Sequence, residues 1–176
     1  MAKKYVITGG PGCGKTTTLN VLKKDYQAIE EAARDVLIGY KKEGLEVSTF
    51  QGDVSQLQAD ILVLQLKREK EVEKYEGIVF LDRGVPDNIA YFNLTGTKIS
   101  NDMLRESQKN VRKYKKVFLL EMIPYKQDSV RKEPEEVAKK VHELIKKAYL
   151  DLGYEVVSVP FMSVEERVQF IKDKIH

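Results

Sequence analysis

The stretch Gly9-Gly10-Pro11-Gly12-Cys13-Gly14-Lys15-Thr16 decides the fold of this chain. It fits the pattern G-x-x-x-x-G-K-[ST], which is the phosphate-binding loop (P-loop) that joins a strand to a helix. An apolar run precedes the loop at residues 4–8, and residues 17–24 after it are typical of a helix. Because the strand–loop–helix context is present, the sequence predicts a site for nucleotide phosphates here.

The residues of the loop have distinct predicted roles. Its glycines let the backbone fold around an anion so that successive N–H groups point inward, and the following helix adds positive charge at its N-terminus. We expect Lys15 to reach the β- and γ-phosphates of ATP and the Thr16 hydroxyl to hold Mg²⁺. The predicted nucleotide contacts are Gly10, Pro11, Gly12, Cys13, Gly14, Lys15, Thr16 and Thr17. The alternative is a glycine-rich turn that binds nothing.

Composition sets limits on the class of protein. The 176 residues suit one domain, so we expect residues 1–176 to form a single P-loop domain. The net charge of +3 does not require a nucleic-acid partner. Cys13 is the one cysteine, which excludes an internal disulfide and a cysteine-built metal site. We expect a cytoplasmic protein without membrane contact, because the sequence shows neither a signal peptide nor a bilayer-spanning run.

Strands and helices alternate along the sequence. Continuous apolar runs predict parallel strands at 4–8, 77–81, 116–120 and 154–159, with a weaker one near 25–29. Asp53 and Gln56 resemble a capping box, Pro134 suits the first turn of another helix, and Ser163 with Glu166 predicts the start of the last helix. This order predicts a three-layer α/β fold around a mainly parallel five-stranded sheet, with ligands at the carboxyl ends of the strands.

Asp82-Arg83-Gly84 stands at one such strand end. Asp82 there suits either Mg²⁺ binding or acceptance of a proton from an attacking hydroxyl, and Arg83 suits a bidentate phosphate contact. A strand-end salt bridge is the structural alternative. Since Arg83, not a second acid, follows Asp82, the pattern favours phosphoryl transfer over plain hydrolysis.

Glu31 and Arg34 follow the weak second strand. If this segment is helical, the two residues share a face, where Glu31 suits a base for an acceptor hydroxyl and Arg34 suits an anionic group of the acceptor. An ordinary surface helix with an intrahelical ion pair is the alternative.

Other candidates lie after the last two strands. Residues 121–133 have the character of a lid, in which Arg131 would clamp phosphate or stack on adenine, or else pair with a neighbouring carboxylate. Phe161 suits the nucleotide-base pocket, although packing in the core is the commoner fate of a phenylalanine. His142 and His176 have no metal-ligand spacing and are interpreted as surface residues.

The chain resembles a family of predicted ATPases with AAA-like P-loop domains, which is similar to nicotinamide riboside kinases. More distantly it is similar to thymidylate and deoxynucleoside kinases. The P-loop, Glu31-Ala-Ala-Arg34, Asp82-Arg83-Gly84 with Asp87 and Tyr91, and the segment from Leu152 to Arg167 carry the resemblance over nearly the whole chain. It implies a kinase-like site, in which Asp87 and Tyr91 would also line the acceptor side. For Tyr91 a packed tyrosine is the alternative.

Together these patterns predict an ATP- and Mg²⁺-dependent phosphotransferase that acts on a small hydroxyl or phosphate acceptor, namely a nucleoside, a nucleotide or a related metabolite. Two alternatives stay open, a regulatory ATPase that signals through a protein partner and a kinase of nucleic-acid ends. A GTPase would need an Asn-Lys-x-Asp guanine reader, and in this sequence Asn is never followed by Lys.

Overall fold

A parallel sheet forms the centre of the molecule. A computed structural model describes residues 2–45, 47, 53–109, 113–123 and 134–175. Within these residues the sheet has five parallel strands in the order β2-β3-β1-β4-β5. They are β1 (Lys3–Thr8), β2 (Gln27–Ile29), β3 (Ile78–Asp82), β4 (Tyr114–Leu120) and β5 (Val156–Val159). The prediction of an α/β fold with a five-stranded parallel sheet is confirmed.

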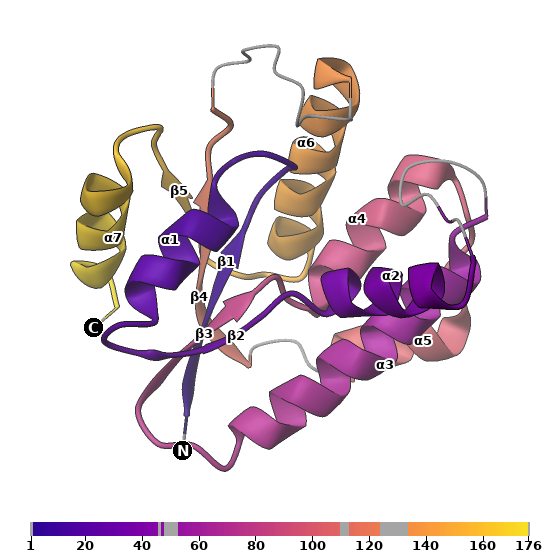
Figure 1. The fold of residues 1–176 in the computed structure, drawn as a ribbon, viewed down its shortest axis with the longest axis horizontal. Helices are drawn as coiled ribbons and strands as arrows, with labels where there is room; N and C mark the ends of the chain where they lie inside the picture. The colour runs from indigo at the N-terminus through magenta and orange to yellow at the C-terminus, as the bar shows by residue number, and fades with distance from the viewer. Residues whose placement is uncertain (1, 46, 48–52, 110–112, 124–133, 176) are drawn as a thin grey trace.

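Helices cover both faces of this sheet (Figure 1). They are α1 (Lys15–Leu22), α2 (Ala32–Lys42), α3 (Ser55–Val72), α4 (Val85–Thr95), α5 (Asn101–Lys109), α6 (Glu135–Asp151) and α7 (Val164–Lys172). One core cluster joins α1 and α7 to one face around Phe80 and Phe118, and a second joins α3, α4 and α6 to the other face around Leu81 and Tyr149. The sheet is therefore buried on both sides, as its continuous apolar strands require.

The N-termini of the helices test the capping residues that were predicted from the sequence. Ser163 and Glu166 form the predicted capping box at α7. The capping box at Asp53 is wrong, because the Asp53 carboxylate accepts the N–H of Ser55 only two residues on, at 2.8 Å, and caps a turn before α3 instead. Pro134 lies directly before α6. The helix α5 was not predicted.

The carboxyl ends of the strands bring distant segments together. The P-loop follows β1, Glu31 follows β2, Asp82 ends β3, and Glu121 follows β4. Because all strands run the same way, these residues meet at one edge of the sheet, where α/β proteins bind ligands. Among the described helices, none combines the length and the hydropathy needed to cross a bilayer.

Candidate active site

The P-loop is shaped by glycines that a side chain would disrupt. Gly9 has φ +141°, and a Cβ there would lie 2.7 Å from the carbonyl oxygen of Leu120. Gly14 has φ +85° at the start of α1, and its Cβ would lie 2.6 Å from a guanidinium nitrogen of Arg167. The positive φ favours glycine at both positions, and at Gly9 a side chain would also collide with the backbone of Leu120.

Lys15 is folded back over the loop. Its side chain is buried, and Nζ donates hydrogen bonds to the carbonyl oxygens of Gly9 (3.0 Å) and Gly10 (2.9 Å). The ammonium group is thus held beside the anion cradle by the loop itself. The positive charge predicted for the phosphate site lies within the loop that would bind it.

Two buried residues hold the P-loop from behind, and their role was not predicted. The interpretation of His142 as a surface residue is wrong, because it is 4% exposed and its Nδ1 accepts the N–H of Gly10 at 3.2 Å. Arg167 is also buried and donates from Nη1 to the carbonyl oxygen of Cys13 at 3.0 Å. The helices α6 and α7 therefore fix the loop through one side chain each.

Asp82 presents a buried carboxylate beside the loop. Its Oδ1 atom has no hydrogen-bond partner among the described residues. Burial, and then the negative charge of Glu31, raise the pKa of Asp82 to about 6. Thr16 and Asp82 line the same groove of about 160 Å³, together with Glu31 and Arg34.

This groove fits the chemistry of a magnesium site. Mg²⁺ takes oxygen ligands, usually one or two from the protein, and keeps several waters and phosphate oxygens. The unpaired Oδ1 of Asp82 and the hydroxyl of Thr16 are such ligands, and they line one groove. In the described residues no group of three or more His, Cys, Asp or Glu side chains is suited to a metal.

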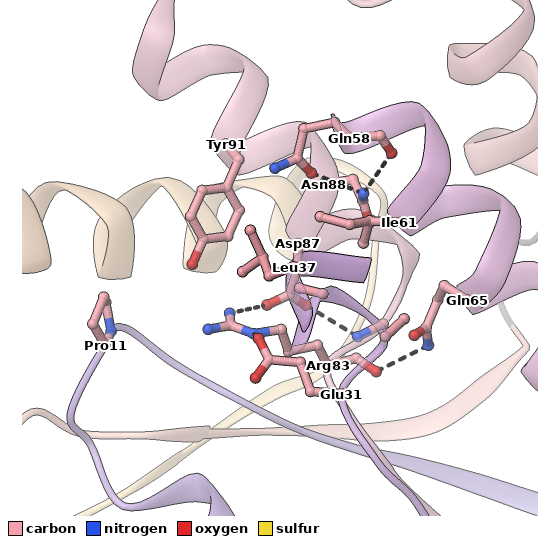
Figure 2. Close-up of a pocket in the computed structure, with 13 residues that line it drawn as sticks. Pro11, Glu31, Leu37, Gln58, Ile61, Gln65, Arg83, Asp87, Asn88 and Tyr91 are labelled. Carbon is pink, nitrogen blue, oxygen red and sulfur yellow. Dashed lines mark hydrogen bonds and ion pairs between the residues drawn. The ribbon is translucent and has the colours of Figure 1, made fainter. Parts of the chain in front are cut away.

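Arg83 is the centre of an ion-pair cluster. Its backbone adopts φ +69°, the left-handed region that is uncommon outside glycine. Nε donates to Glu31 Oε1 at 2.5 Å, and Nη1 donates to Asp87 Oδ1 at 3.0 Å. Figure 2 shows the guanidinium between these two carboxylates. The partner of Glu31 is thus Arg83, across the site, and not an intrahelical neighbour.

Asp87, one of the two partners of Arg83, links several elements of the fold through hydrogen bonds. Its Oδ1 also accepts the Thr8 hydroxyl at 2.6 Å, and its Oδ2 accepts the hydroxyl of Tyr149 at 2.6 Å and the N–H of Gly84 at 3.1 Å. These bonds link the end of β1, the start of α4, and α6. Both oxygens of Asp87 are thus occupied by protein donors, and its place on the acceptor side stays a prediction.

A pocket of about 190 Å³ opens beside the cluster, and we call it the acceptor pocket (Figure 2). Its lining residues are Pro11, Glu31, Ala32, Ala33, Leu37, Gln58, Ile61, Gln65, Arg83, Gly84, Asp87, Asn88 and Tyr91. The groove that contains Thr16 and Asp82 we call the phosphate groove. Glu31 lines both, so it lies where the two spaces adjoin.

The remaining predicted residues fall in different places. Arg34 is exposed and lines the phosphate groove, whereas Tyr91 lines the acceptor pocket, with its ring 5.6 Å from the guanidinium carbon of Arg83. Phe161 is 53% exposed, with its ring 5.6 Å from the guanidinium carbon of Arg167. Arg131 and His176 lie outside the described residues, as do residues 124–133 of the predicted lid. Base binding by Phe161 stays a prediction.

Comparisons with known proteins place this geometry in a family. A sequence model of a family described as an AAA domain matches residues 4–167. The solved structure of NadR protein in complex with NR is similar, with a TM-score of 0.74 and 19% identity, over 99% of this chain and 50% of that one. The chain thus spans half of the NadR chain. No curated protein matches it.

Two further solved structures match this chain over nearly the whole length of both chains. A deoxyadenosine kinase from M. mycoides with dCMP and dCDP has a TM-score of 0.62 and 17% identity, with 98% of each chain covered. A thymidylate kinase from Ehrlichia chaffeensis has a TM-score of 0.67 and 12% identity, with 99% of each chain covered. At these identities the likeness shows a shared fold, that of P-loop kinases.

Proposed function

We propose that this chain, which belongs to the AAA domain family, is an ATP- and Mg²⁺-dependent kinase that phosphorylates a small acceptor. One observation carries the proposal, namely that Glu31 lines both the phosphate groove and the acceptor pocket. A carboxylate where a donor site meets an acceptor site is the arrangement that phosphoryl transfer uses to orient or deprotonate its nucleophile.

On the donor side, the loop amides and Lys15 would hold the phosphates of ATP. Thr16 and Asp82 would hold Mg²⁺, which when bound neutralises phosphate charge. Arg34 lines the same groove and would add positive charge there. In this arrangement catalysis consists mostly of positioning and charge compensation.

On the acceptor side, Glu31 is the group we propose as base. Burial favours its neutral form, but the positive charges of Arg83 and Lys15 outweigh burial, so the pKa of Glu31 is lowered. Glu31 is therefore ionised at neutral pH and able to accept a proton. Arg83 fixes its orientation through the 2.5 Å contact, which makes Arg83 a positioning residue in this proposal.

The neighbours support an acceptor of the nucleoside or nucleotide class. NadR binds NR, and the other two neighbours are a deoxyadenosine kinase and a thymidylate kinase. Those ligands and names belong to the three neighbours, and we extend the class of acceptor to this chain as a proposal.

A phosphate-transfer screen tests the function. ATP labelled at the γ-phosphate is supplied with Mg²⁺ and with pooled nucleosides, nucleotides, related vitamins and 5′-hydroxyl oligonucleotides. We expect label on a small acceptor. Label on an oligonucleotide alone would instead identify a kinase of nucleic-acid ends, and ATP turnover that no acceptor changes would identify a regulatory ATPase.

Two variants then separate transfer from hydrolysis. Glu31→Gln should lower kcat for transfer by about 10²–10⁴-fold, the usual effect of removing a general base. Arg34→Ala serves as a charge variant of the phosphate groove that leaves Glu31 in place. Equal ATP consumption in wild type and in both variants, with and without acceptor, would reject the kinase assignment.

A further inference from the structure

The charges of the acceptor pocket are unusual for a site that receives a phosphate. Among its described lining residues, the charged side chains are Glu31, Arg83 and Asp87. The one guanidinium is paired with both carboxylates, at 2.5 Å and 3.0 Å. The lining therefore carries more negative than positive formal charge, and the guanidinium of Arg83 is already paired with the carboxylates of Glu31 and Asp87.

The other polar side chains of the pocket are uncharged. Asn88 Nδ2 donates to the backbone oxygen of Gln58 at 3.2 Å and to its side-chain Oε1 at 2.9 Å. Gln65 Nε2 donates to the backbone oxygen of Arg83 at 3.2 Å. Leu37 and Ile61 supply apolar surface. Such a lining suits a neutral polar ring better than an anion.

The positive side chains gather on the other side of Glu31. Lys23 and Arg34 line the phosphate groove together with the carboxylates of Glu30, Glu31 and Asp82. Lys23 is paired with Glu30, and Lys15 is held by the P-loop. A phosphate-bearing substrate would therefore meet Lys15, Arg34 and the proposed Mg²⁺ at the groove. Among the described residues that line the acceptor pocket, the cation is Arg83, which is already paired with two carboxylates.

Resting on the proposed kinase function, we propose that the acceptor carries no phosphate and reacts through a hydroxyl, so that the enzyme accepts nucleosides, neutral or cationic, and rejects nucleotides. In the reaction the hydroxyl oxygen forms a bond to the γ-phosphorus of ATP. The bond from that phosphorus to the bridging oxygen breaks, and its electron pair leaves with ADP. The hydroxyl proton passes to the Glu31 carboxylate. A phosphate acceptor, ionised already, has no such proton to give.

Matched acceptor pairs test this inference. Each common ribonucleoside and deoxynucleoside, with nicotinamide riboside, is compared with its own 5′-monophosphate at equal concentration, and transfer from labelled ATP is measured. We expect kcat/KM for at least one nucleoside to exceed that of its monophosphate by about 100-fold or more. Equal or faster phosphorylation of the monophosphate would overturn the inference but leave the kinase function standing. Transfer to neither member of any pair would overturn the inference, and the phosphate-transfer screen described above would then decide the kinase function separately.

A charge variant tests the cause. Leu37→Lys places a cation in the lining, while Leu37→Gln is the uncharged control of similar length. We expect Leu37→Lys to lower KM for the monophosphate by about 10-fold relative to Leu37→Gln. The same KM for the monophosphate in both folded variants would show that charge does not set the preference.

A separate observation concerns His142, which contacts the P-loop from α6. Its Nδ1 accepts the Gly10 N–H at 3.2 Å, while the Gly10 carbonyl oxygen accepts Lys15 Nζ at 2.9 Å. A Cβ on Gly10 would lie 3.0 Å from the carbonyl oxygen of Ala138 and 3.1 Å from the Cβ of His142, so the loop lies directly on α6. Gly10 thus links His142 to the P-loop lysine, through its N–H on one side and its carbonyl oxygen on the other.

This contact requires neutral histidine. With Nδ1 as acceptor, the ring proton is on Nε2, which lies 3.4 Å from Oε2 of Glu121. Protonated histidine would instead direct an N–H from Nδ1 at the Gly10 N–H. The charged groups that act on the ring are Glu121 after β4, Glu143 and Lys146 on α6, and Lys15 on α1. Burial lowers the pKa of His142 although Glu121 opposes this, which favours the neutral form at neutral pH.

We infer that His142 is a positioning residue that holds the first turn of the P-loop in place while it is neutral and releases it when protonated. ATP affinity without Mg²⁺ is measured from about pH 5 to about pH 8 for wild type, His142→Asn and His142→Leu. The Asn oxygen can accept the Gly10 N–H but does not titrate.

We expect the wild-type affinity to fall about 10-fold more toward acidic pH than that of His142→Asn, and His142→Leu to bind weakly at every pH. Titration of ATP itself is common to all three proteins. Parallel pH profiles for wild type and His142→Asn, or strong binding by a folded His142→Leu protein at neutral pH, would overturn the inference.

Discussion

Replacing Asp82 with Asn should make the ligand-free protein more stable at neutral pH while impairing its use of Mg²⁺. Asp82 is buried, and one of its oxygens has no hydrogen-bond partner among the described residues. A buried carboxylate without enough partners destabilises the fold when it is ionised. The same unpaired charge is what the proposed site offers to a cation. Stability and function should therefore change in opposite directions.

The magnitude follows from the pKa. Burial, with Glu31 adding to it, raises the pKa of Asp82 from its ordinary value of 3.8 to about 6. At about 1.4 kcal/mol per pKa unit, ionised Asp82 lowers the free energy of unfolding by about 3 kcal/mol at neutral pH. Because the folded state binds the proton more tightly, this loss develops as pH rises from about 4 to about 6 and then stays constant. Asp82→Asn should thus raise the free energy of unfolding by about 2 kcal/mol more at about pH 7.5 than at about pH 4.5.

Denaturant unfolding of the ligand-free protein at both pH values measures this difference. Comparing the two pH values removes any fixed cost of burying the new amide. Asp102→Asn is the control, since the side chain of Asp102 is 94% exposed on α5 and its loss should change stability little. The Mg²⁺ concentration for half-maximal transfer should rise in Asp82→Asn only. A stability change that is the same at both pH values, with unchanged Mg²⁺ dependence, would refute the reasoning.

Three further substitutions have sharp expectations. Lys15→Ala should weaken ATP binding by about 1.5–3 kcal/mol and abolish transfer, and full activity in the folded variant would contradict the P-loop assignment. Gly84→Ala should destabilise the fold by about 1–3 kcal/mol, because its Cβ would lie 2.7 Å from the Tyr149 hydroxyl and 2.9 Å from that of Tyr114; thermal unfolding measures this. Arg167→Lys should weaken ATP binding about 10-fold in a calorimetric titration, because one ammonium cannot reproduce the separate guanidinium contacts to the carbonyl oxygens of Cys13 and Met162, and wild-type affinity would rule out this role.

The fold could be predicted because its signals are local. The P-loop motif and the continuous apolar runs each lie within one segment of sequence, and the rule that parallel strands alternate with helices does the rest. The capping box of Ser163 and Glu166 spans four residues and was predicted for the same reason. At Asp53 the same pattern was misleading, since aspartate also caps short turns through the N–H two residues on.

The candidate site could be predicted only in part, because its pairings join distant segments. Glu31 and Arg83 were both identified, but their ion pair depends on how β2 and β3 align. His142 contacts a residue 132 positions away. A signal did exist, since Ala138, His142, Ile145 and Tyr149 form a buried stripe at helical spacing on α6. His142 was instead interpreted as a surface residue, because it has no metal-ligand spacing.

The sequence could not decide whether Glu31 or Asp82 is the base, and the structure distinguishes these two carboxylates. Glu31 and Asp82 both line the phosphate groove, but Arg83 donates to Glu31 from its Nε, whereas Asp82 keeps an unpaired oxygen. The pKa of Glu31 is consequently lowered, while that of the more deeply buried Asp82 is raised to about 6. Neighbouring acids whose pKa values are driven apart generally serve different roles. A carboxylate that is ionised without a metal and adjoins the acceptor pocket is suited to accept a proton. One that gains stability when a cation arrives is suited to hold Mg²⁺, which supports Glu31 as base and Asp82 as metal ligand.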